Sequence, residues 1–426
     1  MITALLLLSF TILILLNVPI GVCLGGSSIL ALIGLDIRFD MIPTIFYAST
    51  SKFVLLAIPF FILGGNIMEK AGISGKLINM AQTLVGHIRG GLAMVCIFVA
   101  CFFAAISGSG PATVAALGMI VIPSMVKVGY KPATAAALMA TAGGIGVIIP
   151  PSISFIIYGA VTGTSISKLF MAGIIPGLLM GGALIMATFL TVKSSDLKRL
   201  PKASGKERLV ALKEAFWGLL MPVIILGGIY GGIFTPTEAA CVSAVYGLVV
   251  SVFVYKTVGL KEFYEIIVTS VSQTAVVMFI VATASLFAWI ITIEGIATAV
   301  SNFIIGIAGG NVVIFLLIVN ITLIIAGCII DGVSAFYIFA PIIYPIALKL
   351  GYDPTVLGVV MVMNLAIGMV TPPVGVNLYV ACGLSNVSFK DISKAVWPFV
   401  LASVVVLLIV TYVPAISLFL PGLFMK

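Results

Sequence analysis

Charged residues are scarce in this chain of 426 residues, since only 8% are charged whereas 62% are apolar. Soluble domains typically carry about 25% charged residues, because a surface that faces water must be covered by polar groups. The composition therefore excludes an ordinary water-soluble domain. The net charge of +8 does not indicate nucleic-acid binding, because the basic residues lie in short connections between apolar runs, as the positive-inside rule predicts.

Residues that carry enzymatic chemistry are also scarce. The single histidine, His87, lies close to Arg89 in a polar connection, and the six cysteines are scattered without a Cys-x-x-Cys pair. We interpret the cysteines as small apolar fillers. The chain has no HExxH motif, no pair of membrane aspartates, no Ser/His constellation and no P-loop. We therefore expect neither an intramembrane enzyme nor ATP hydrolysis by this chain.

Long apolar stretches are what the sequence has instead. Runs of about 20 apolar residues recur along the whole length, which is typical of membrane-spanning helices. The first run follows Met1-Ile2-Thr3 without a basic segment, so we expect a retained span rather than a cleaved signal peptide. The sequence therefore predicts an all-α, multi-pass membrane protein embedded in a lipid bilayer.

The two halves of the chain resemble each other on either side of a basic stretch at 193–208. The motif Gly129-Tyr130-x-Pro132 recurs as Gly351-Tyr352-x-Pro354, and at the same offset Pro150-Pro151 recurs as Pro372-Pro373. This coincidence indicates an internal repeat. The first Gly-Tyr loop is flanked by lysines and the second has no positive excess, so the two loops are expected on opposite sides of the membrane. Inverted-topology repeats of this kind are typical of secondary transporters.

Each repeat is expected to contain a re-entrant helical hairpin. In the first repeat, two apolar arms of about 16 residues flank the Ser/Gly/Pro-rich tip at 107–111, and each arm reaches only about 24 Å, short of a hydrocarbon core of about 30 Å. The predicted organisation begins with N-terminal scaffold span(s) at 1–40. Repeat 1 follows at 41–192, with a scaffold helix, a hairpin at 91–126 and a broken helix at 131–161. A cytoplasmic basic loop at 193–214 leads to repeat 2 at 215–426, with a hairpin at 313–349 and a broken helix at 354–384.

Each hairpin is followed by a helix that should be interrupted in its middle. Glycines followed by two consecutive prolines at 150–151 and 372–373 should unwind these segments, because proline removes an amide donor and clashes with the preceding turn. The freed carbonyl groups can bind a cation, and the half-helix that follows can direct its positive dipole end at an anion. The alternative interpretation is an ordinary packing kink.

Asp331 is an ionisable residue inside a long apolar run, at the second hairpin tip. A bound Na⁺ would neutralise it, with hydroxyl and carbonyl oxygens completing a hard-cation site. The alternative is a structural aspartate that caps the tip. Glu238 is expected to open a helix and Glu294 to lie at the end of a span.

Neither of the interrupted stretches, 143–152 and 364–373, contains arginine or lysine. An anionic substrate would therefore depend on half-helix N-termini, on bound cations, and on polar side chains such as Ser152, Ser154 and Asn377.

Five motifs are spread along the chain. They are Ile-Ser-Gly-Ser-Gly-Pro-Ala-Thr at 106–113, Gly-Tyr-Lys-Pro at 129–132, Gly-Gly-Ile-Gly-Val-Ile-Ile-Pro-Pro-Ser at 143–152, Asp331-Gly332, and Thr-Pro-Pro-Val-Gly at 371–375. Together they resemble the large (M) membrane subunit of tripartite ATP-independent periplasmic (TRAP) transporters, and the resemblance covers essentially the whole chain. It implies an elevator-type ion-transporter-like fold and sodium symport, with two or more transported Na⁺ ions, no ATP and location in the bacterial inner membrane. It also implies a small four-helix (Q-type) membrane subunit, expected not to be fused here, and a periplasmic (P-type) binding protein. Sialic acid and C4-dicarboxylates are the leading substrate candidates.

The resemblance also assigns residues to sites. It implies one sodium site at the first hairpin tip and break, and a second at their repeat equivalents, with the substrate between the tips. The predicted sodium ligands are Ser107, Ser109, Gly146, Ile149 and Pro151 for the first site, and Asp331, Gly332, Gly368, Met369 and Thr371 for the second. The predicted substrate-binding residues are Gly110, Thr113, Ser152, Ser154, Val374 and Asn377.

Two alternative functions remain open from the sequence. A stand-alone sodium/dicarboxylate symporter would share the hairpins and broken helices, and a requirement for a binding protein would separate the two. A channel is less consistent with inverted repeats and occluding hairpins, which favour alternating access. The sequence identifies neither the substrate nor the oligomeric state.

Overall fold

The computed structural model describes residues 2–88, 90–192 and 197–425, and every regular element in these ranges is a helix. Seven of the described helices are long and apolar enough to cross a membrane, and the pair Phe389–Ala395 and Trp397–Tyr412, bent by 46°, could form one more span. The predicted all-α, multi-pass architecture is thus confirmed. Arg89 and residues 193–196 of the predicted basic loop lie outside the described residues.

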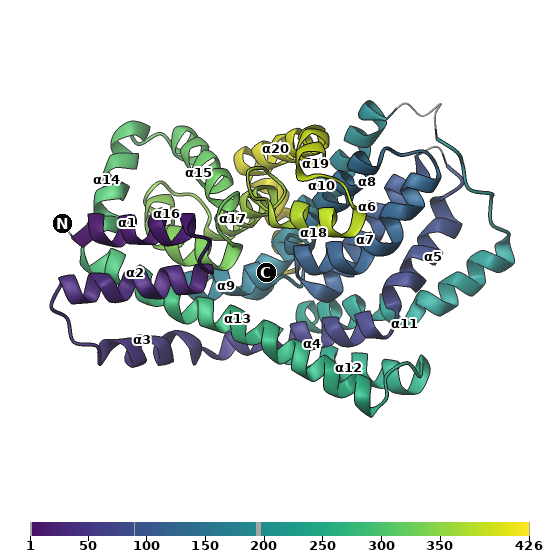
Figure 1. Ribbon diagram of the computed structural model, residues 1–426, viewed down its shortest axis with the longest axis horizontal. Coiled ribbons are helices and arrows are strands. Elements are labelled where there is room, and N and C mark those ends of the chain that lie inside the picture. The colour runs from purple at the N-terminus through teal and green to yellow at the C-terminus, as the bar shows by residue number, and fades with distance from the viewer. Residues whose placement is uncertain (1, 89, 193–196, 426) are drawn as a thin grey trace.

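The first half of the chain contains ten helices in the described residues (Figure 1). A short 3₁₀ turn at Phe53–Leu56 precedes the fourth, and another at Ile145–Val147 follows the eighth. The helices are α1 (Ile2–Leu15), α2 (Ile20–Gly34), α3 (Met41–Thr50), α4 (Ala57–Lys70), α5 (Ile73–Val85), α6 (Gly91–Ser107), α7 (Gly110–Lys127), α8 (Pro132–Gly144), α9 (Ile153–Thr162) and α10 (Ile166–Thr191).

The second half repeats this order with three differences: one long helix, α13, replaces α3 and α4, two helices, α19 and α20, replace α10, and α21 is added at the end. Its helices are α11 (Gly205–Tyr230), α12 (Pro236–Val249, continued by a π-helical turn at Val250–Val254), α13 (Leu260–Ile293), α14 (Ile296–Ala308), α15 (Val312–Gly327), α16 (Gly332–Lys349), α17 (Pro354–Gly368), α18 (Val376–Ser385), α19 (Phe389–Ala395), α20 (Trp397–Tyr412) and α21 (Ala415–Phe424).

The predicted basic loop at 193–214 is too long, because α11 already begins at Gly205. A reciprocal capping box starts this helix. The Glu207 amide donates to Ser204 Oγ over 3.2 Å, and the Ser204 amide donates to the Glu207 carboxylate over 2.6 Å. Sequence reasoning placed the boundary at the start of the apolar run and missed the Ser-x-x-Glu signal. Glu238 opens α12 through the same arrangement with Thr235, as predicted.

The two halves are interlocked by reciprocal helix contacts. In the repeat, α2 corresponds to α12, and α4 corresponds to the second part of α13. The structure packs α4 against α12 and, equivalently, α13 against α2. Likewise α7 packs against α18 while α16 packs against α9. Reciprocal pairs of this kind are what a pseudo-two-fold relation between inverted repeats produces.

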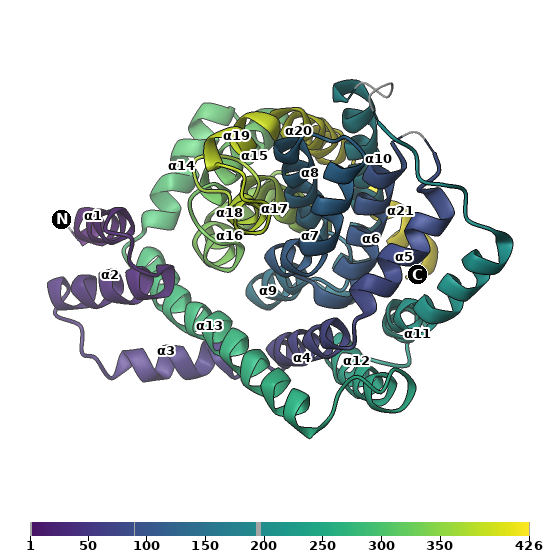
Figure 2. The same cartoon turned by 45° about the vertical axis from the view of Figure 1, so that its right-hand side comes forward.

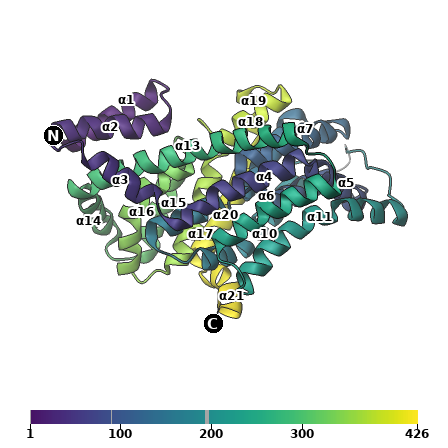
Figure 3. The same cartoon turned by 90° about the horizontal axis from the view of Figure 1, so that it is seen from below.

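The helices form two groups. Figures 1 and 2 show α2, α3, α13, α4 and α12 along the lower side of the molecule, with the hairpins and broken helices gathered above them. From below, α13, α4 and α11 cross in front of that inner group (Figure 3). The two predicted hairpins are α6–α7 and α15–α16, and the two broken helices are α8–α9 and α17–α18, which confirms this part of the predicted fold.

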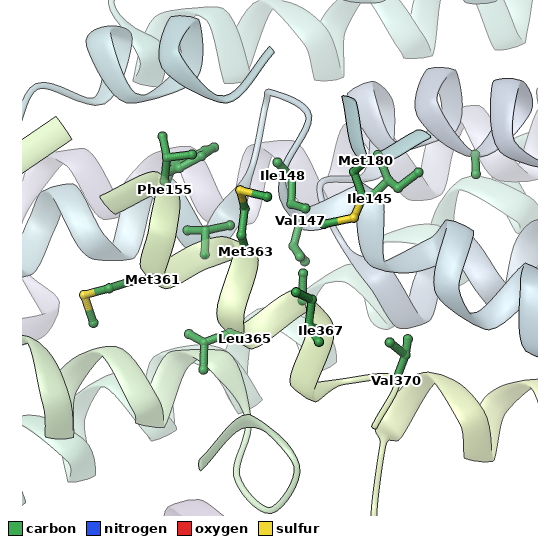
Figure 4. Close-up of a cluster of buried hydrophobic side chains, with 14 of the residues drawn as sticks. Ile145, Val147, Ile148, Phe155, Met180, Met361, Met363, Leu365, Ile367 and Val370 are labelled. Atoms are coloured by element: carbon green, nitrogen blue, oxygen red, sulfur yellow. The ribbon is translucent and has the colours of Figure 1, made fainter. Parts of the chain in front are cut away.

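The two broken helices meet at the centre of the inner group. Figure 4 shows Ile145 and Ile148 of the first break beside Ile367 and Val370 of the second. The backbones approach closely here, since a Cβ at Gly144 would lie 3.3 Å from the Ala366 carbonyl oxygen. This apolar contact fixes the two interrupted segments relative to each other.

Candidate functional site

The first hairpin tip carries a small network of hydroxyl groups. Gly108, at φ 61°, ends α6 and turns the chain into α7, a conformation that glycine adopts without a steric penalty. Thr113 Oγ1 donates to the Ser109 carbonyl oxygen over 2.8 Å, and the Ser107 and Thr113 hydroxyls lie 3.1 Å apart. Thr113 is fully buried and Ser107 nearly so. The tip therefore gathers three oxygen atoms inside the protein.

The break between α8 and α9 lies directly against this tip. A Cβ at Gly146 would lie 3.0 Å from Thr113 Oγ1 and 3.3 Å from the Ser109 carbonyl oxygen. A Cβ at Gly108 would lie 3.0 Å from the Pro151 carbonyl oxygen. Four of the five residues predicted for the first sodium site, all except Ile149, are therefore close together. Hydroxyl and carbonyl oxygens of this kind are ligands that suit a hard cation such as Na⁺.

Ile149 is the one predicted ligand of the first sodium site that the structure does not place beside the others. Its side chain packs against α10, since a Cβ at Gly177 would lie 2.5 Å from Ile149 Cγ1. Its assignment concerns the backbone carbonyl group and stays a prediction.

At the second tip, Asp331 caps α16. Its Oδ2 accepts from the amides of Val333 at 2.9 Å and Ser334 at 3.2 Å, and its Oδ1 accepts from the Ser334 hydroxyl. The capping alternative from the sequence is therefore a real role of this residue. It does not exclude cation binding, because an ionised carboxylate has about four acceptor positions and these bonds use three.

In the second repeat, the break lies even closer to the hairpin than it does in the first repeat. A Cβ at Gly368 would lie 2.5 Å from the Gly327 Cα atom and 2.8 Å from its carbonyl oxygen. Thr371 Oγ1 donates to the Ile367 carbonyl oxygen over 2.6 Å, and the backbone amide of Asn377 donates to the Met369 carbonyl oxygen over 3.0 Å. Both predicted ligands, Thr371 and Met369, thus form bonds within the break, and each oxygen keeps a further lone pair for a cation.

Each half-helix after a break reaches the hairpin tip of the other repeat. A Cβ at Gly332 would lie 3.9 Å from Ser154 Oγ, and a Cβ at Gly110 would lie 3.2 Å from Asn377 Nδ2. Asn377 is fully buried, and its Nδ2 donates to the Ala140 carbonyl oxygen over 3.1 Å. Its Oδ1 has no partner among the described residues. Ser154, Asn377 and Gly110 therefore lie where the two repeats meet.

Other predicted substrate residues are placed differently. The Ser152 hydroxyl caps α9 and is engaged inside the break, where it donates to the Val147 carbonyl oxygen over 2.6 Å and accepts from the Phe155 amide over 3.4 Å. Thr113 lies behind the first tip, next to the predicted sodium ligands. Val374 lies in the segment between α17 and α18, half-buried. These assignments stay predictions.

A cavity of about 530 Å³ lies between the first hairpin tip and the helices α4 and α13. Ser107 and Ser109 line it from the tip, and residues that sequence reasoning missed line it from the other side. These are the polar residues Asn66, Glu69, Ser272 and Gln273. A signal for them exists in the sequence, because Ser272 and Gln273 interrupt the apolar run of α13, and Asn66 and Glu69 lie in the last turns of an apolar helix.

Two interlocked repeats, with hairpin tips facing breaks and a cavity beside one tip, define a membrane transporter rather than an enzyme. The sequence matches the family "Tripartite ATP-independent periplasmic transporter, DctM component" over residues 7–416. The chain therefore belongs to this family, the large permease subunits of TRAP transporters, as its motifs suggested.

Two relatives illustrate the similarity. The C4-dicarboxylate TRAP transporter large permease protein DctM of Rhodobacter capsulatus is 40% identical over 426 residues, covering 96% of this chain and 97% of the relative. The isethionate TRAP transporter permease protein DctMQ of Oleidesulfovibrio alaskensis is 43% identical over 415 residues, covering 97% of this chain. The chain spans 65% of the length of that second protein.

Among solved structures, the YdaH transporter of Alcanivorax borkumensis has a similar fold. The TM-score is 0.66 over 96% of this chain and 97% of that one, at 15% sequence identity. At this identity the similarity concerns the fold alone. It agrees with the predicted elevator-type ion-transporter-like fold class.

Proposed function

We propose that this chain is the sodium-driven transmembrane subunit of a bacterial inner-membrane transporter that imports a small carboxylate. The observation that carries the proposal is the meeting of each hairpin tip with a helix break, as in the approach of Gly146 to Ser109 and of Gly368 to Gly327. Unwound backbone at membrane depth is tolerated only where it is buried or lines a polar cavity. Here it gathers carbonyl and hydroxyl oxygens without basic residues, which suits Na⁺ rather than an anion alone.

The two sodium sites are proposed with the residues predicted from the sequence. The first takes Ser107, Ser109, Gly146, Ile149 and Pro151, and the second takes Asp331, Gly332, Gly368, Met369 and Thr371. We add Thr113 to the first set, because its hydroxyl lies between Ser107 and Gly146. A bound Na⁺ neutralises Asp331 and adds positive charge beside the tips, where the substrate carboxylate then binds near Gly110, Ser154 and Asn377.

Alternating access in this proposal is a movement of the inner helices against α4 and α13. The cavity lies between these two groups, beside the first tip. Residues 198–200 of the connection between α10 and α11 pack against the ends of α5 and α7. The Leu200 amide donates to the Gly86 carbonyl oxygen and the Lys198 amide to the Val128 carbonyl oxygen. By the positive-inside rule this end faces the cytoplasm.

The partners follow from the family. A small four-helix membrane subunit and a periplasmic binding protein complete the transporter, and ATP has no role. The name of the DctMQ relative joins the two permease letters, M and Q, in one protein. For this chain both partners are part of the proposal, as is the substrate, for which sialic acid and C4-dicarboxylates are the leading candidates.

The experiment is uptake of a radiolabelled carboxylate by proteoliposomes that contain this chain and its small subunit. An inward sodium gradient is applied with and without the periplasmic binding protein, and a potassium gradient serves as the control. Uptake that needs both sodium and the binding protein is the expected result. Sodium-dependent uptake without the binding protein would instead identify a stand-alone symporter, and uptake indifferent to sodium would contradict the sodium sites.

A further inference from the structure

The cavity beside the first hairpin tip has two chemically different walls. The tip contributes the hydroxyls of Ser107 and Ser109, close to the start of α7. The opposite wall, formed by α4 and α13, contributes Asn66, Glu69, Ser272 and Gln273. We call these four residues the polar wall. The repeat equivalents of Asn66 and Glu69 are Ala288 and Ile291, so the amide and the carboxylate on α4 have no polar counterpart in the other repeat.

The amides of the polar wall are already oriented. Asn66 Nδ2 donates to Ser270 Oγ over 2.9 Å and to Gln273 Oε1 over 3.0 Å. This leaves Asn66 Oδ1 and Gln273 Nε2 without a side-chain partner among the described residues. One is an acceptor and the other a donor, which is the combination that a hydroxyl group can satisfy in both directions. A few placed polar groups in a largely apolar cavity are typical of a ligand site.

The charge of the cavity is the second observation. Among the described residues that line it, Glu69 is the only ionisable one, and no lysine or arginine lines it. The neighbouring Lys70 pairs with Glu265 over 3.1 Å, while the described residues show no ion pair to Glu69. A ligand that fills the cavity therefore meets a negative charge at the wall opposite the hairpin tip. Like charges brought together in this way discriminate against a partner rather than attract it.

We propose that this cavity selects a monocarboxylate whose remaining part is neutral and carries hydroxyl groups, and that Glu69 is the residue that rejects a second carboxylate. The inference rests on the proposed function and specifies its substrate. The single carboxylate lies toward Ser107, Ser109 and the start of α7. The hydroxyl-bearing part lies against Asn66 and Gln273, and the second carboxylate of a C4-dicarboxylate would be placed beside Glu69.

The test is direct binding to the purified complex of this chain with its small subunit, in sodium, without the binding protein, whose own specificity would mask the effect. The probes are D-gluconate as the hydroxylated monocarboxylate and succinate as the dicarboxylate, each measured by calorimetry and by the shift in thermal unfolding. The variants are Glu69→Gln, Gln273→Ala and, as a matched control, Glu265→Gln, which removes a carboxylate that pairs with Lys70 outside the cavity. Their unfolding temperatures without ligand check that each variant is folded.

We expect the unmodified complex to bind gluconate at least about tenfold more tightly than succinate, because like-charge contacts typically cost at least that much. Glu69→Gln should bring the two affinities within about a factor of three, since an amide removes the repulsion. Gln273→Ala should weaken gluconate binding without improving succinate binding, and Glu265→Gln should change neither.

The outcomes separate this inference from the function it rests on. If both probes bind with similar affinity and Glu69→Gln does not change their ratio, the polar wall does not select the substrate, although the carboxylate transporter stands. If succinate binds better than gluconate in the unmodified complex, the assignment of Glu69 is reversed and the inference is overturned. If neither probe binds in sodium although the complex is folded, the proposed carboxylate site fails together with the inference.

Discussion

At the level of single residues, Asp331 combines a structural bond pattern with a proposed functional charge. It caps α16 in the same way that Asp353 caps α17, since each carboxylate accepts from two successive amides at the start of its helix. Asp353 caps its helix without lying at a hairpin tip, so capping alone does not explain why an aspartate lies at the tip. What distinguishes Asp331 is its place at the tip of the second hairpin, whose Gly327 lies directly against Gly368 of the break.

Replacing Asp331 with asparagine should separate these two roles. Asparagine caps helices about as well as aspartate, so the unfolding temperature should change little, whereas the loss of the negative charge should weaken sodium binding. We expect the sodium concentration for half-maximal uptake to rise at least about tenfold, which corresponds to about 1.4 kcal/mol of cation binding. Asp353→Asn is the matched control. An unchanged sodium dependence in Asp331→Asn would mean that the second sodium site is misplaced.

Gly368 is a residue whose lack of a side chain is required by the structure. A Cβ there would lie 2.5 Å from the Gly327 Cα and carbonyl carbon atoms, so the second hairpin and the second break could not keep their contact. Gly368→Ala should destabilise the protein by about 1–3 kcal/mol and abolish uptake. The measurement is thermal unfolding in detergent together with sodium-dependent uptake.

The control for this substitution is Gly383→Ala, in α18, where a Cβ would meet no atom within 4 Å. Alanine has the better helix propensity, so this variant should be as stable as the unmodified protein and fully active. An active, stable Gly368→Ala would show that the close approach of the two backbones is not needed for transport.

The sequence predicted the site residues that interrupt an apolar run, but not the contacts that join one repeat to the other. Asp331 and the two Pro-Pro pairs stand out in apolar runs, and their recurrence at one offset identified hairpins and breaks that the structure contains. The contacts of Ser154 with the second tip and of Asn377 with the first could not be derived, because they join different repeats. Asn66 and Glu69 were missed because polar residues near a helix end usually face water.

At the level of elements, the two repeats differ in how the first hairpin arm is attached. In the second repeat, a buried polar network joins α15, α17 and α20. Asn364 Nδ2 donates to Asn320 Oδ1 over 2.8 Å, and Asn320 Nδ2 donates to Thr411 Oγ1 over 3.2 Å. The equivalent positions in the first repeat are Phe98, Ala142 and Phe189. The first repeat therefore has apolar residues at the positions where the second repeat has this hydrogen-bonded network.

Removing one member of this network should cost more than removing two. Asn320→Leu removes one of the two acceptors of the buried Asn364 Nδ2, which keeps only its bond to the Val360 carbonyl oxygen. A buried polar hydrogen left without an acceptor costs about 1–3 kcal/mol. The double variant Asn320→Leu with Asn364→Leu should recover part of this loss, because no unpaired polar group then remains between these two positions. A double-mutant cycle on thermal unfolding measures the coupling. Additive losses would contradict a direct bond between the two asparagines.

At the level of the whole molecule, the fold class followed from composition and repeats, but the interlocking did not. Each half packs its scaffold helix against the other half, α4 on α12 and α13 on α2, and no local pattern in the sequence encodes a contact between such distant segments. This exchange has a mechanical consequence. The outer helices of both repeats form one continuous group, and in the proposed transport cycle the hairpins and broken helices move against it as a second group.

If the inner group moves against α4 and α13 during transport, the exposure of the cavity wall should depend on the cargo. We expect a cysteine in place of Ser272, which lines the cavity on α13, to react with a membrane-impermeant thiol reagent from the cytoplasmic side only. Ile233→Cys, in the turn between α11 and α12 and 71% exposed, should react only from the opposite side and so controls the orientation. The six native cysteines are distinguished by peptide mass spectrometry.

Sodium together with substrate should slow the labelling of Ser272→Cys, because a ligand shifts a conformational equilibrium toward the state that it binds more tightly. The labelling of Ile233→Cys should be unaffected. Labelling of Ser272→Cys from both sides, at a rate that the cargo does not change, would indicate a channel rather than alternating access.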